Sequence, residues 1–522
     1  MTQLATGTPL GHSDDRAQRA LWRSFSRGVR YNVIAEVGIQ VLRFSAMVIL
    51  ARTLGPSDFG LFKIVLVLSL LAVTVAQFGV PDALVQRRTL SPQVQAAALW
   101  ASVSLTVVVA GAMWLCAPVA ARWLRIASLQ WALRLMCAGV VLEGLSVVPD
   151  ARLRREMRFG ALATADFVAE LGFVIVALGM LACGAGVGSL VGGLAVRFAL
   201  HGLVLWVACG RSALRSLRPG PARELARFSL SAACAKVVVL AAGNLDYVLV
   251  GRILGSSALG FYAMAWDLLR FVPDRMHKVA GRVALPAFCR LARNGPSLAA
   301  AYRGLFAQIA RFVVPVAACL ALGAPEVIEG IYGPRWLLAA MPLRLLAFGL
   351  ALVGLRVGMG SVFYTRDYPS FDVYLNGARV LLIIAAVSIA SRFGLGGVSA
   401  AMSLTEGVVS LVGIGLACRL ARMSPLELVR CLGAPLRSTA FCLLAVAAGK
   451  WLVFRFDLYG IAAALAVSVP AASVFLALEL ASLAEALGLK TGASRPEASA
   501  MTSDGALALG AEGARIAQPL VD

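Results

Sequence analysis

The chain has 522 residues, of which 60% are hydrophobic and only 14% are charged, and its mean hydropathy is +0.83. Soluble globular chains are typically about 45–50% apolar and about 25% charged, so this composition excludes an ordinary soluble enzyme, a disordered chain and a fibrous repeat. The formal net charge of +21 occurs in nucleic-acid-binding proteins and in basic membrane proteins, so the placement of the charges must decide between these classes.

The first apolar stretch follows a polar, arginine-rich segment over residues 1–28. It begins near Tyr31 and runs to Leu54, which is long enough to cross about 30 Å of hydrocarbon and too long for the apolar part of a cleavable signal peptide. We therefore expect a first membrane helix that is retained in the mature protein.

Fourteen apolar stretches of this kind follow one another along the chain, punctuated by Gly, Pro and charged residues. The weakest candidate is 260–285, because it carries charged residues such as Asp267, Arg270 and Asp274. The sequence predicts an all-α polytopic membrane protein with about 14 transmembrane helices, at residues 31–53, 61–80, 93–116, 129–148, 160–182, 187–209, 228–251, 260–285, 304–323, 337–361, 372–391, 395–418, 436–454 and 458–482.

Basic residues are concentrated in alternate connections between these stretches. If the N-terminus is cytoplasmic, 24 of them fall in cytoplasmic segments and 8 in outer loops. Cytoplasmic segments of membrane proteins carry such an excess, so we expect a multi-pass protein of the bacterial inner membrane with both termini in the cytoplasm. Topology and attraction to membrane lipids then account for most of the positive charge, which argues against a nucleic-acid partner.

An internal repeat relates the two halves of the chain. Residues 51–62 read ARTLGPSDFGLF and residues 251–262 read GRILGSSALGFY, so that Gly55 and Gly255 are among five identical pairs at an offset of 200. Each copy joins an odd-numbered helix to the next one across a short turn. An offset that preserves membrane direction predicts two six-helix lobes with a parallel pseudo-two-fold relation, and two extra C-terminal helices.

This repeat sets the expected domain organisation. We expect a basic cytoplasmic N-terminal segment, a first six-helix lobe, a basic cytoplasmic linker, a second six-helix lobe, a cytoplasmic loop with helices 13 and 14, and a disordered cytoplasmic tail. Their boundaries are 1–28, 29–210, 211–227, 228–418, 419–482 and 483–522.

Metal and disulfide sites are not expected. The ten cysteines are scattered without a CxxC pair and lie mostly in apolar stretches, and the three histidines are dispersed. We expect neither a bound metal nor any other cofactor.

Several segments resemble the polysaccharide transporter branch of the MOP superfamily, the Wzx-type oligosaccharide flippases. They are LGPSDFGLF and FGVPDALVQRR around the second helix, LRREMRF before the fifth, and NLDYVLVGRILGSSALGFYAMA and VALPAFCRLAR across the seventh and eighth. The resemblance covers about residues 30–430. It implies two lobes with twelve to fourteen helices, and export of undecaprenyl-pyrophosphate-linked repeat units for exopolysaccharide, capsule or O-antigen by alternating access through a cationic central cavity. A polysaccharide polymerase and export proteins are the further partners we expect.

A diphosphate headgroup needs cationic donors inside the membrane, and charges placed there normally face a cavity or a partner. Charged residues within the predicted helices include Lys236 and Asp246 in the seventh, and also Glu170 and Arg197, to which no role is assigned. Arg43 and Lys236 occupy the equivalent opening helices of the two lobes, with Arg270 behind them. The candidate substrate-binding cations are Arg43, Lys236, Arg270, Arg311, Arg134, Arg344 and Arg379.

Acidic residues and helix breakers complete the candidate site. Glu36, Asp246 and Asp267 are either ion-coupling residues, for a proton or sodium gradient or the membrane potential, or counter-ions of the cations. Candidate hinges for alternating access are Pro81, Pro273, Gly55 and Gly255.

Three alternatives remain open. A lipid II flippase would also carry a diphosphate, whereas a MATE-type antiporter favours acidic cavities, and the cations here outnumber the acids within the helices. A membrane glycan polymerase or ligase would need a large outer loop, and no predicted outer loop is long enough. We therefore expect a transporter and not an enzyme.

Overall fold

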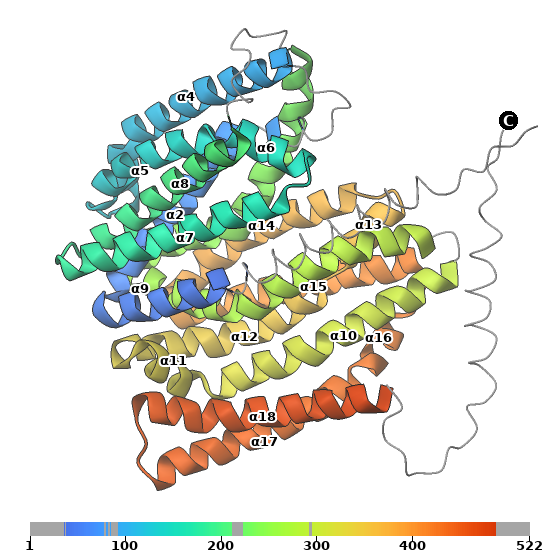
Figure 1. Ribbon diagram of the computed structural model, residues 1–522. Helices are drawn as coiled ribbons and strands as arrows, with labels where there is room; N and C mark the ends of the chain where they lie inside the picture. The colour runs from blue at the N-terminus through green and yellow to red at the C-terminus, as the bar shows by residue number, and fades with distance from the viewer. Residues whose placement is uncertain are drawn as a thin grey trace, which may run out of the picture. The chain divides into compact units, whose positions relative to one another are not determined.

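The computed structural model describes residue 36 and residues 38–77, 80–81, 84, 92–210, 223–291 and 295–486, and over these residues the chain forms helices and connecting turns without a strand (Figure 1). The first helical segment covers residues 38–53. After it come α2 (Pro56–Gln77), α4 (Pro92–Leu124), α5 (Leu129–Gly144), α6 (Val147–Arg155), α7 (Phe159–Ala182), α8 (Gly188–Cys209), α9 (Arg223–Leu291), α10 (Gly295–Leu322), α11 (Ala324–Tyr332), η2 (Pro334–Ala339), α12 (Ala340–Leu355), α13 (Met359–Thr365), α14 (Ser370–Ala390), η3 (Ser391–Phe393), α15 (Gly394–Ala421), α16 (Pro425–Cys431), α17 (Gly433–Arg455) and α18 (Gly460–Ala486).

The predicted all-α membrane architecture is confirmed. The described residues contain eleven segments that are long and apolar enough to cross a membrane. The predicted helices 228–251 and 260–285 correspond to the two parts of α9 on either side of a kink at Gly255, and 372–391 and 395–418 correspond to α14 and α15. The exact number of fourteen spans remains a prediction.

The helices form two lobes, which meet where α2 packs on α9. The first lobe consists of the 38–53 segment and of α2, α4, α5, α7 and α8, and its last four helices pack on one another (Figure 1). The second lobe consists of α9, α10, α12, α14 and α15, and its last four helices also pack on one another. The first lobe meets the second mainly where α2 packs along α9. A compact unit formed by these helices ends at Ala472, within α18.

A kink at Gly255 divides α9 into two arms. This residue has φ 87° and ψ 172°, a conformation that side chains with a Cβ rarely adopt. Its repeat partner Gly55 is a described residue without a positive φ. The backbone N–H of Gly55 donates to the Asp58 carboxylate at 3.2 Å. Of the other candidate hinges, Pro81 lies beyond the end of α2, and Pro273 lies within α9, where its side chain is outside the described residues.

The repeated glycines Gly60 and Gly260 are where the two lobes touch most closely. A Cβ on Gly60 would collide with the backbone carbonyl of Ser256, and a Cβ on Gly260 would collide with that of Pro56. Pro56 and Ser256 are themselves related by the 200-residue offset. The repeat seen in the sequence is therefore a reciprocal backbone contact, which only glycine permits.

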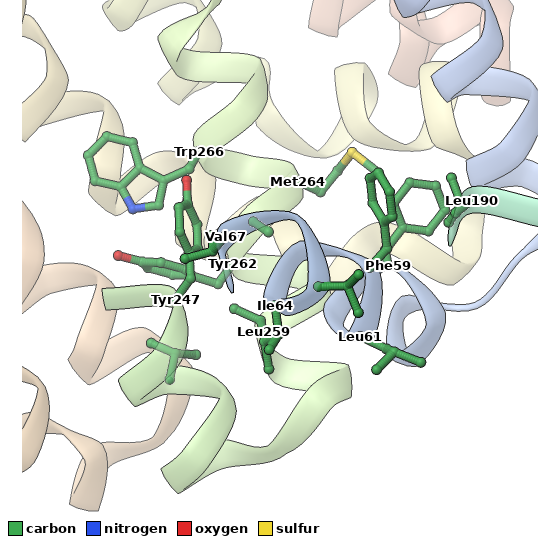
Figure 2. Close-up of a cluster of buried hydrophobic side chains, with 14 of the residues drawn as sticks. Phe59, Leu61, Ile64, Val67, Leu190, Tyr247, Leu259, Tyr262, Met264 and Trp266 are labelled. Carbon is green, nitrogen blue, oxygen red and sulfur yellow. The ribbon is translucent and has the colours of Figure 1, made fainter. Parts of the chain in front are cut away.

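Apolar side chains surround this contact. Ile64 and Leu259 are fully buried between α2 and α9, and the rings of Tyr247, Tyr262 and Trp266 lie on one side of them (Figure 2). The rings pack edge to face, with centroids 5.8 Å apart for the two tyrosines and 6.3 Å apart for Tyr262 and Trp266. This cluster forms the core between the lobes.

We call the end of the bundle near Gly55 and Gly255 the closed end, because side chains of each lobe reach the other there. Arg52 donates to the backbone carbonyls of Gly330 and Ile331 at the end of α11, and the Trp336 indole donates to the Ala51 carbonyl at 2.8 Å. These contacts form what we call the inter-lobe clasp. The repeat partner of Arg52, Arg252, makes the corresponding contact with the first lobe, because its guanidinium lies 5.6 Å from the centre of the Trp123 ring.

Candidate functional site

A cavity of about 400 Å³ lies between the lobes, lined by residues of the 38–53 segment, α2, α7, α8 and α9 and by Tyr332 of α11. This volume is within the range of about 300–1,000 Å³ that is typical of ligand sites. Equivalent helix positions of the two lobes line it, since five pairs of lining residues are related by the 200-residue offset: Phe44 and Asn244, Met47 and Tyr247, Lys63 and Ala263, Val67 and Asp267, and Leu70 and Arg270.

The cavity lining carries more positive than negative charge. Four basic side chains and two carboxylates line it, which leaves a net formal charge of +2: Arg43, Lys63, Arg197 and Arg270 against Glu170 and Asp267. Charges among membrane-spanning helices are costly and normally face a cavity or a partner. This cavity therefore suits a ligand with more than one negative charge.

Two arginines of the first lobe converge on one carboxylate. The Arg43 guanidinium donates two hydrogen bonds to Glu170, from Nε to Oε1 at 2.8 Å and from the terminal nitrogen to Oε2 at 2.6 Å. Nε of Arg197 lies 3.3 Å from the same Oε2. Glu170 is only 2% exposed, whereas the side chains of Arg43 and Arg197 are 40% and 35% exposed. The carboxylate therefore holds two guanidinium groups together at the cavity wall.

Lys63 joins the two lobes within the cavity. It extends from α2 of the first lobe, and its ammonium lies 2.6 Å from Oδ1 of Asp267 on α9 of the second lobe. The same nitrogen lies 4.4 Å from the centre of the Tyr247 ring, also on α9, where the ring face attracts a cation. We call the Lys63–Asp267 contact the inter-lobe ion pair.

Arg270 is held against the wall of the second lobe. Its guanidinium donates to the Gly243 carbonyl at 3.3 Å and lies 4.5 Å from the centre of the Trp266 ring. Gly243 is the repeat partner of Arg43. In the second lobe, the guanidinium of Arg270 therefore lies next to the residue that is equivalent by the repeat to Arg43 of the first lobe.

Only part of the predicted cation set comes together. Arg43 and Arg270 line the cavity, as does Asp267. Among the described cavity-lining residues, Lys236 is not found, although it lies on α9 at an exposed position. The other predicted cations, which also lie away from the lining, are Arg134, Arg311, Arg344 and Arg379.

Two of these cations have structural partners elsewhere. Arg379 of α14 is buried and donates to Glu406 of α15, from Nε at 2.9 Å and from a terminal nitrogen. The guanidinium of Arg134 on α5 lies 5.1 Å from the centre of the Trp114 ring on α4. These contacts are within single lobes and hold neighbouring helices together.

The other two acidic candidates lie off the cavity lining. Asp246 is 1% exposed and accepts a hydrogen bond from the Tyr262 hydroxyl at 2.9 Å through Oδ2, while its Oδ1 has no hydrogen-bond partner. Glu36 accepts a hydrogen bond from Gln40, one turn along the first helical segment, at 3.4 Å. An ion-coupling role for either residue remains a prediction.

Lys63 and Arg197 line the cavity but are not among the candidate cations, and for Lys63 the boundary of α2 explains why. The hydropathy pattern starts the second helix at residue 61 and so places Lys63 near its outer end, whereas α2 begins at Pro56. The helix therefore buries Lys63 more than one turn from its start. The repeat offers a signal for Lys63. Its repeat partner is Ala263, and Asp267 lies four residues, or one helical turn, after Ala263.

Comparison with known proteins gives a family match. The sequence model of the polysaccharide biosynthesis protein family matches residues 49–341, which is more than half of the chain.

Individual proteins are similar over most of their length. The chain is 24% identical over 376 residues to lipopolysaccharide biosynthesis protein WzxC of Escherichia coli (strain K12), covering 70% of this chain and 75% of WzxC. It is 20% identical over 406 residues to teichuronic acid biosynthesis protein TuaB of Bacillus subtilis (strain 168), covering 75% and 82%. Among solved structures, the lipid II flippase MurJ in an inward closed conformation aligns with a TM-score of 0.68 at 12% identity, covering 87% of this chain and 99% of that chain. The likeness to MurJ shows a shared fold.

Proposed function

Because the chain belongs to the polysaccharide biosynthesis protein family, we propose that it is a flippase that moves undecaprenyl-pyrophosphate-linked oligosaccharide repeat units across the inner membrane. The names of the similar proteins WzxC and TuaB place them in the biosynthesis of lipopolysaccharide and of teichuronic acid, which are both polymers with sugar components. The fold that the chain shares with a lipid flippase supports transport as the activity.

The observation that carries this proposal is the net positive cavity between two lobes. A diphosphate has several oxygens that bind planar guanidinium groups in pairs, and a water-filled cationic cavity offsets the cost of moving it through hydrocarbon. Arg43, Arg197 and Arg270 expose guanidinium groups there, and Lys63 supplies an ammonium. Movement of the lobes about their shared core would then expose the headgroup to each side in turn.

The charge of the cavity weighs against a MATE-type antiporter of cationic drugs, because four basic groups would repel such substrates. A lipid II flippase needs the same diphosphate chemistry, and the family match to polysaccharide biosynthesis favours the oligosaccharide substrate. A membrane polymerase or ligase would need a large outer loop, and the described turns between α4 and α5, between α7 and α8 and between α17 and α18 span only a few residues each.

We propose that the closed end faces away from the cytoplasm and that both termini are cytoplasmic. Arg152, Arg154 and Arg155 of α6, and Arg419 and Arg422 at the end of α15, would then face the cytoplasm, as the excess of basic residues on that side requires. Reporter enzymes fused after Arg158 should report the cytoplasm, and a fusion after Gly186 should report the outside. An inverted result for either fusion would contradict this orientation.

The partners and the energy source are part of the proposal. A polymerase or export complex would receive the flipped repeat units, and a proton or sodium gradient or the membrane potential would drive transport, without a bound cofactor.

A deletion strain with intact glycosyltransferases tests the function. We expect a complete undecaprenyl-pyrophosphate-linked repeat unit to accumulate on the cytoplasmic face of the inner membrane, as determined by extraction, mass spectrometry and accessibility to a glycan-specific probe in sealed vesicles. Units that reach the outer face but stay unpolymerised would contradict a flippase and indicate a role in polymerisation.

A further inference from the structure

The two carboxylates of the cavity are built differently. Glu170 is 2% exposed and its two arginine partners belong to the same lobe, so it is enclosed by the first lobe alone. Asp267 is 39% exposed and its partner Lys63 comes from the other lobe. An anion that enters the cavity therefore meets an accessible carboxylate at Asp267 and an enclosed one at Glu170.

Lys63 is the group over which the ligand and the second lobe compete. Its side chain is only 12% exposed, and its ammonium is enclosed by Asp267 and by the Tyr247 ring. A diphosphate carries more negative charge than a carboxylate, so it competes well for an ammonium that already has one anionic partner. Binding to Lys63 must loosen the contact of this residue with Asp267.

We propose that an anionic headgroup displaces Asp267 from Lys63 and so breaks the inter-lobe ion pair, while Glu170 stays in place and positions Arg43 and Arg197. This inference rests on the proposed function and assigns the headgroup diphosphate to that site. A ligand shifts a conformational equilibrium only through a difference in affinity between the two states. Here the difference arises because the ligand gains Lys63 only in the state in which Asp267 has released it.

The proposal predicts opposite effects from two matched substitutions. Asp267→Asn and Glu170→Gln each remove one negative charge from the cavity without changing the side-chain shape. If the overall charge of the cavity alone decided affinity, both would strengthen the binding of an anion. If Asp267 competes with the ligand and Glu170 positions its arginines, Asp267→Asn strengthens binding and Glu170→Gln weakens it.

The experiment measures binding of farnesyl diphosphate, a short polyisoprenyl diphosphate, to the purified full chain in nanodiscs. We expect Asp267→Asn to bind about threefold tighter than the wild-type chain, the size typical of a partly exposed ion pair. We expect Glu170→Gln to bind about tenfold weaker, because Arg43 and Arg197 repel each other without their shared partner. The control Glu326→Gln removes a carboxylate from the Lys450 ion pair between α11 and α17, away from the cavity, and should leave the affinity unchanged.

A second experiment measures the distance between the two lobes at the closed end. Spin labels at exposed Thr53 and exposed Leu338 lie on different lobes at the closed end, and are introduced after the native cysteines have been replaced. Farnesyl diphosphate should lengthen the distance between the labels in the otherwise unchanged chain, and Asp267→Asn should lengthen it without ligand. Size-exclusion chromatography checks folding, and Asp267→Ser provides a second variant if Asp267→Asn does not fold.

The outcomes separate the two proposals. If the wild-type chain does not bind farnesyl diphosphate, the proposed function fails and the inference fails with it. If it binds, but Asp267→Asn leaves the affinity and the label distance unchanged, the proposed function stands and displacement of Asp267 is wrong. If Glu170→Gln tightens binding as Asp267→Asn does, the positioning role of Glu170 is wrong.

Discussion

At the scale of single residues, two arginine–glutamate pairs differ in how much of the arginine side chain stays exposed. Arg43 uses two donors on Glu170 and is still 40% exposed toward the cavity. Arg379 makes a similar pair with Glu406, but both side chains are buried within the second lobe. The same pair of residue types therefore lies at the cavity wall in one lobe and joins two helices in the interior of the other.

Replacing Arg43 should reduce glycan export. Arg43→Ala removes a guanidinium that can donate to a phosphate, and charge-assisted hydrogen bonds contribute about 1.5–3 kcal/mol, so we expect export to fall roughly tenfold to a hundredfold. Arg43→Lys keeps the charge but not the paired donors, and should restore export only in part. The measurement is surface polysaccharide per cell at equal amounts of membrane protein. Lys236→Ala, on α9 but away from the cavity lining, is the control with near wild-type export.

Replacing Arg379 should lower stability. Arg379→Ala leaves Glu406 buried and unpaired, which costs about 3–5 kcal/mol. Replacement of both residues in Arg379→Met with Glu406→Leu should recover most of the loss, because no buried charge remains. Thermal unfolding of the purified variants measures both effects. If the single variant is as stable as the wild-type chain but does not transport, Arg379 contacts the substrate and is not a structural residue.

At the scale of helices, the packing of α2 on α9 depends on small residues at one crossing. Gly60 and Gly260 let the two backbones approach so closely that the carbonyls of Ser256 and Pro56 occupy the space of the missing side chains. The rings of Tyr247, Tyr262 and Trp266, from both sides of the kink in α9, pack edge to face in the same buried core.

Adding one methyl group at this crossing should destabilise the chain. Gly60→Ala and Gly260→Ala each push a Cβ into a backbone carbonyl, and overpacking of this kind typically costs about 1–3 kcal/mol. Gly111→Ala is the matched control, because a Cβ there meets nothing within 4 Å in the helical α4, and alanine favours helix. Melting temperatures in detergent should fall for the first two variants and stay equal or rise for the third. Equal melting temperatures for all three would contradict the close contact.

At the scale of the whole molecule, two sets of polar contacts among the described residues connect the lobes besides the packing of α2 on α9. The inter-lobe clasp lies at the closed end, and the inter-lobe ion pair lies in the cavity. Both connect the first lobe to the second through side chains at a few positions, as does Arg252 on the Trp123 ring, whereas Ile64 and Leu259 add apolar packing between α2 and α9. Polar contacts that water can replace are suited to being made and broken during transport.

Removing the clasp should open the closed end. Arg52→Ala loses the donors to the Gly330 and Ile331 carbonyls, so a cysteine at buried Phe59 should react faster with a membrane-impermeant thiol reagent in a background without native cysteines. Arg335→Ala, at an exposed position of η2, is the control. An unchanged labelling rate for Arg52→Ala would show that the clasp does not keep this end closed.

The fold could be predicted from the sequence because length, hydropathy and an internal repeat together specify the helices and the two lobes. The site could be predicted only in part. Arg43 and Arg270 could be chosen from their place in equivalent helices, but Lys236, chosen in the same way, does not line the cavity. A helix that is apolar on both its core face and its lipid face has no sequence pattern that shows which side chains point into a cavity. Glu170 and Arg197 were visible as charges within helices, but their shared contact with Arg43 depends on three helices from different parts of the chain.

The reciprocal glycine contact also makes the closed end a fulcrum. Two backbones in direct contact cannot move closer together. While Gly60 and Gly260 keep this contact, the lobes can tilt about it but cannot approach each other further there. The arm of α9 that follows the kink covers residues 256–291, or about 54 Å of helix at 1.5 Å per residue. A tilt of about 10° at this point would displace the far end of a straight arm of this length by about 9 Å, and groups near the closed end by much less.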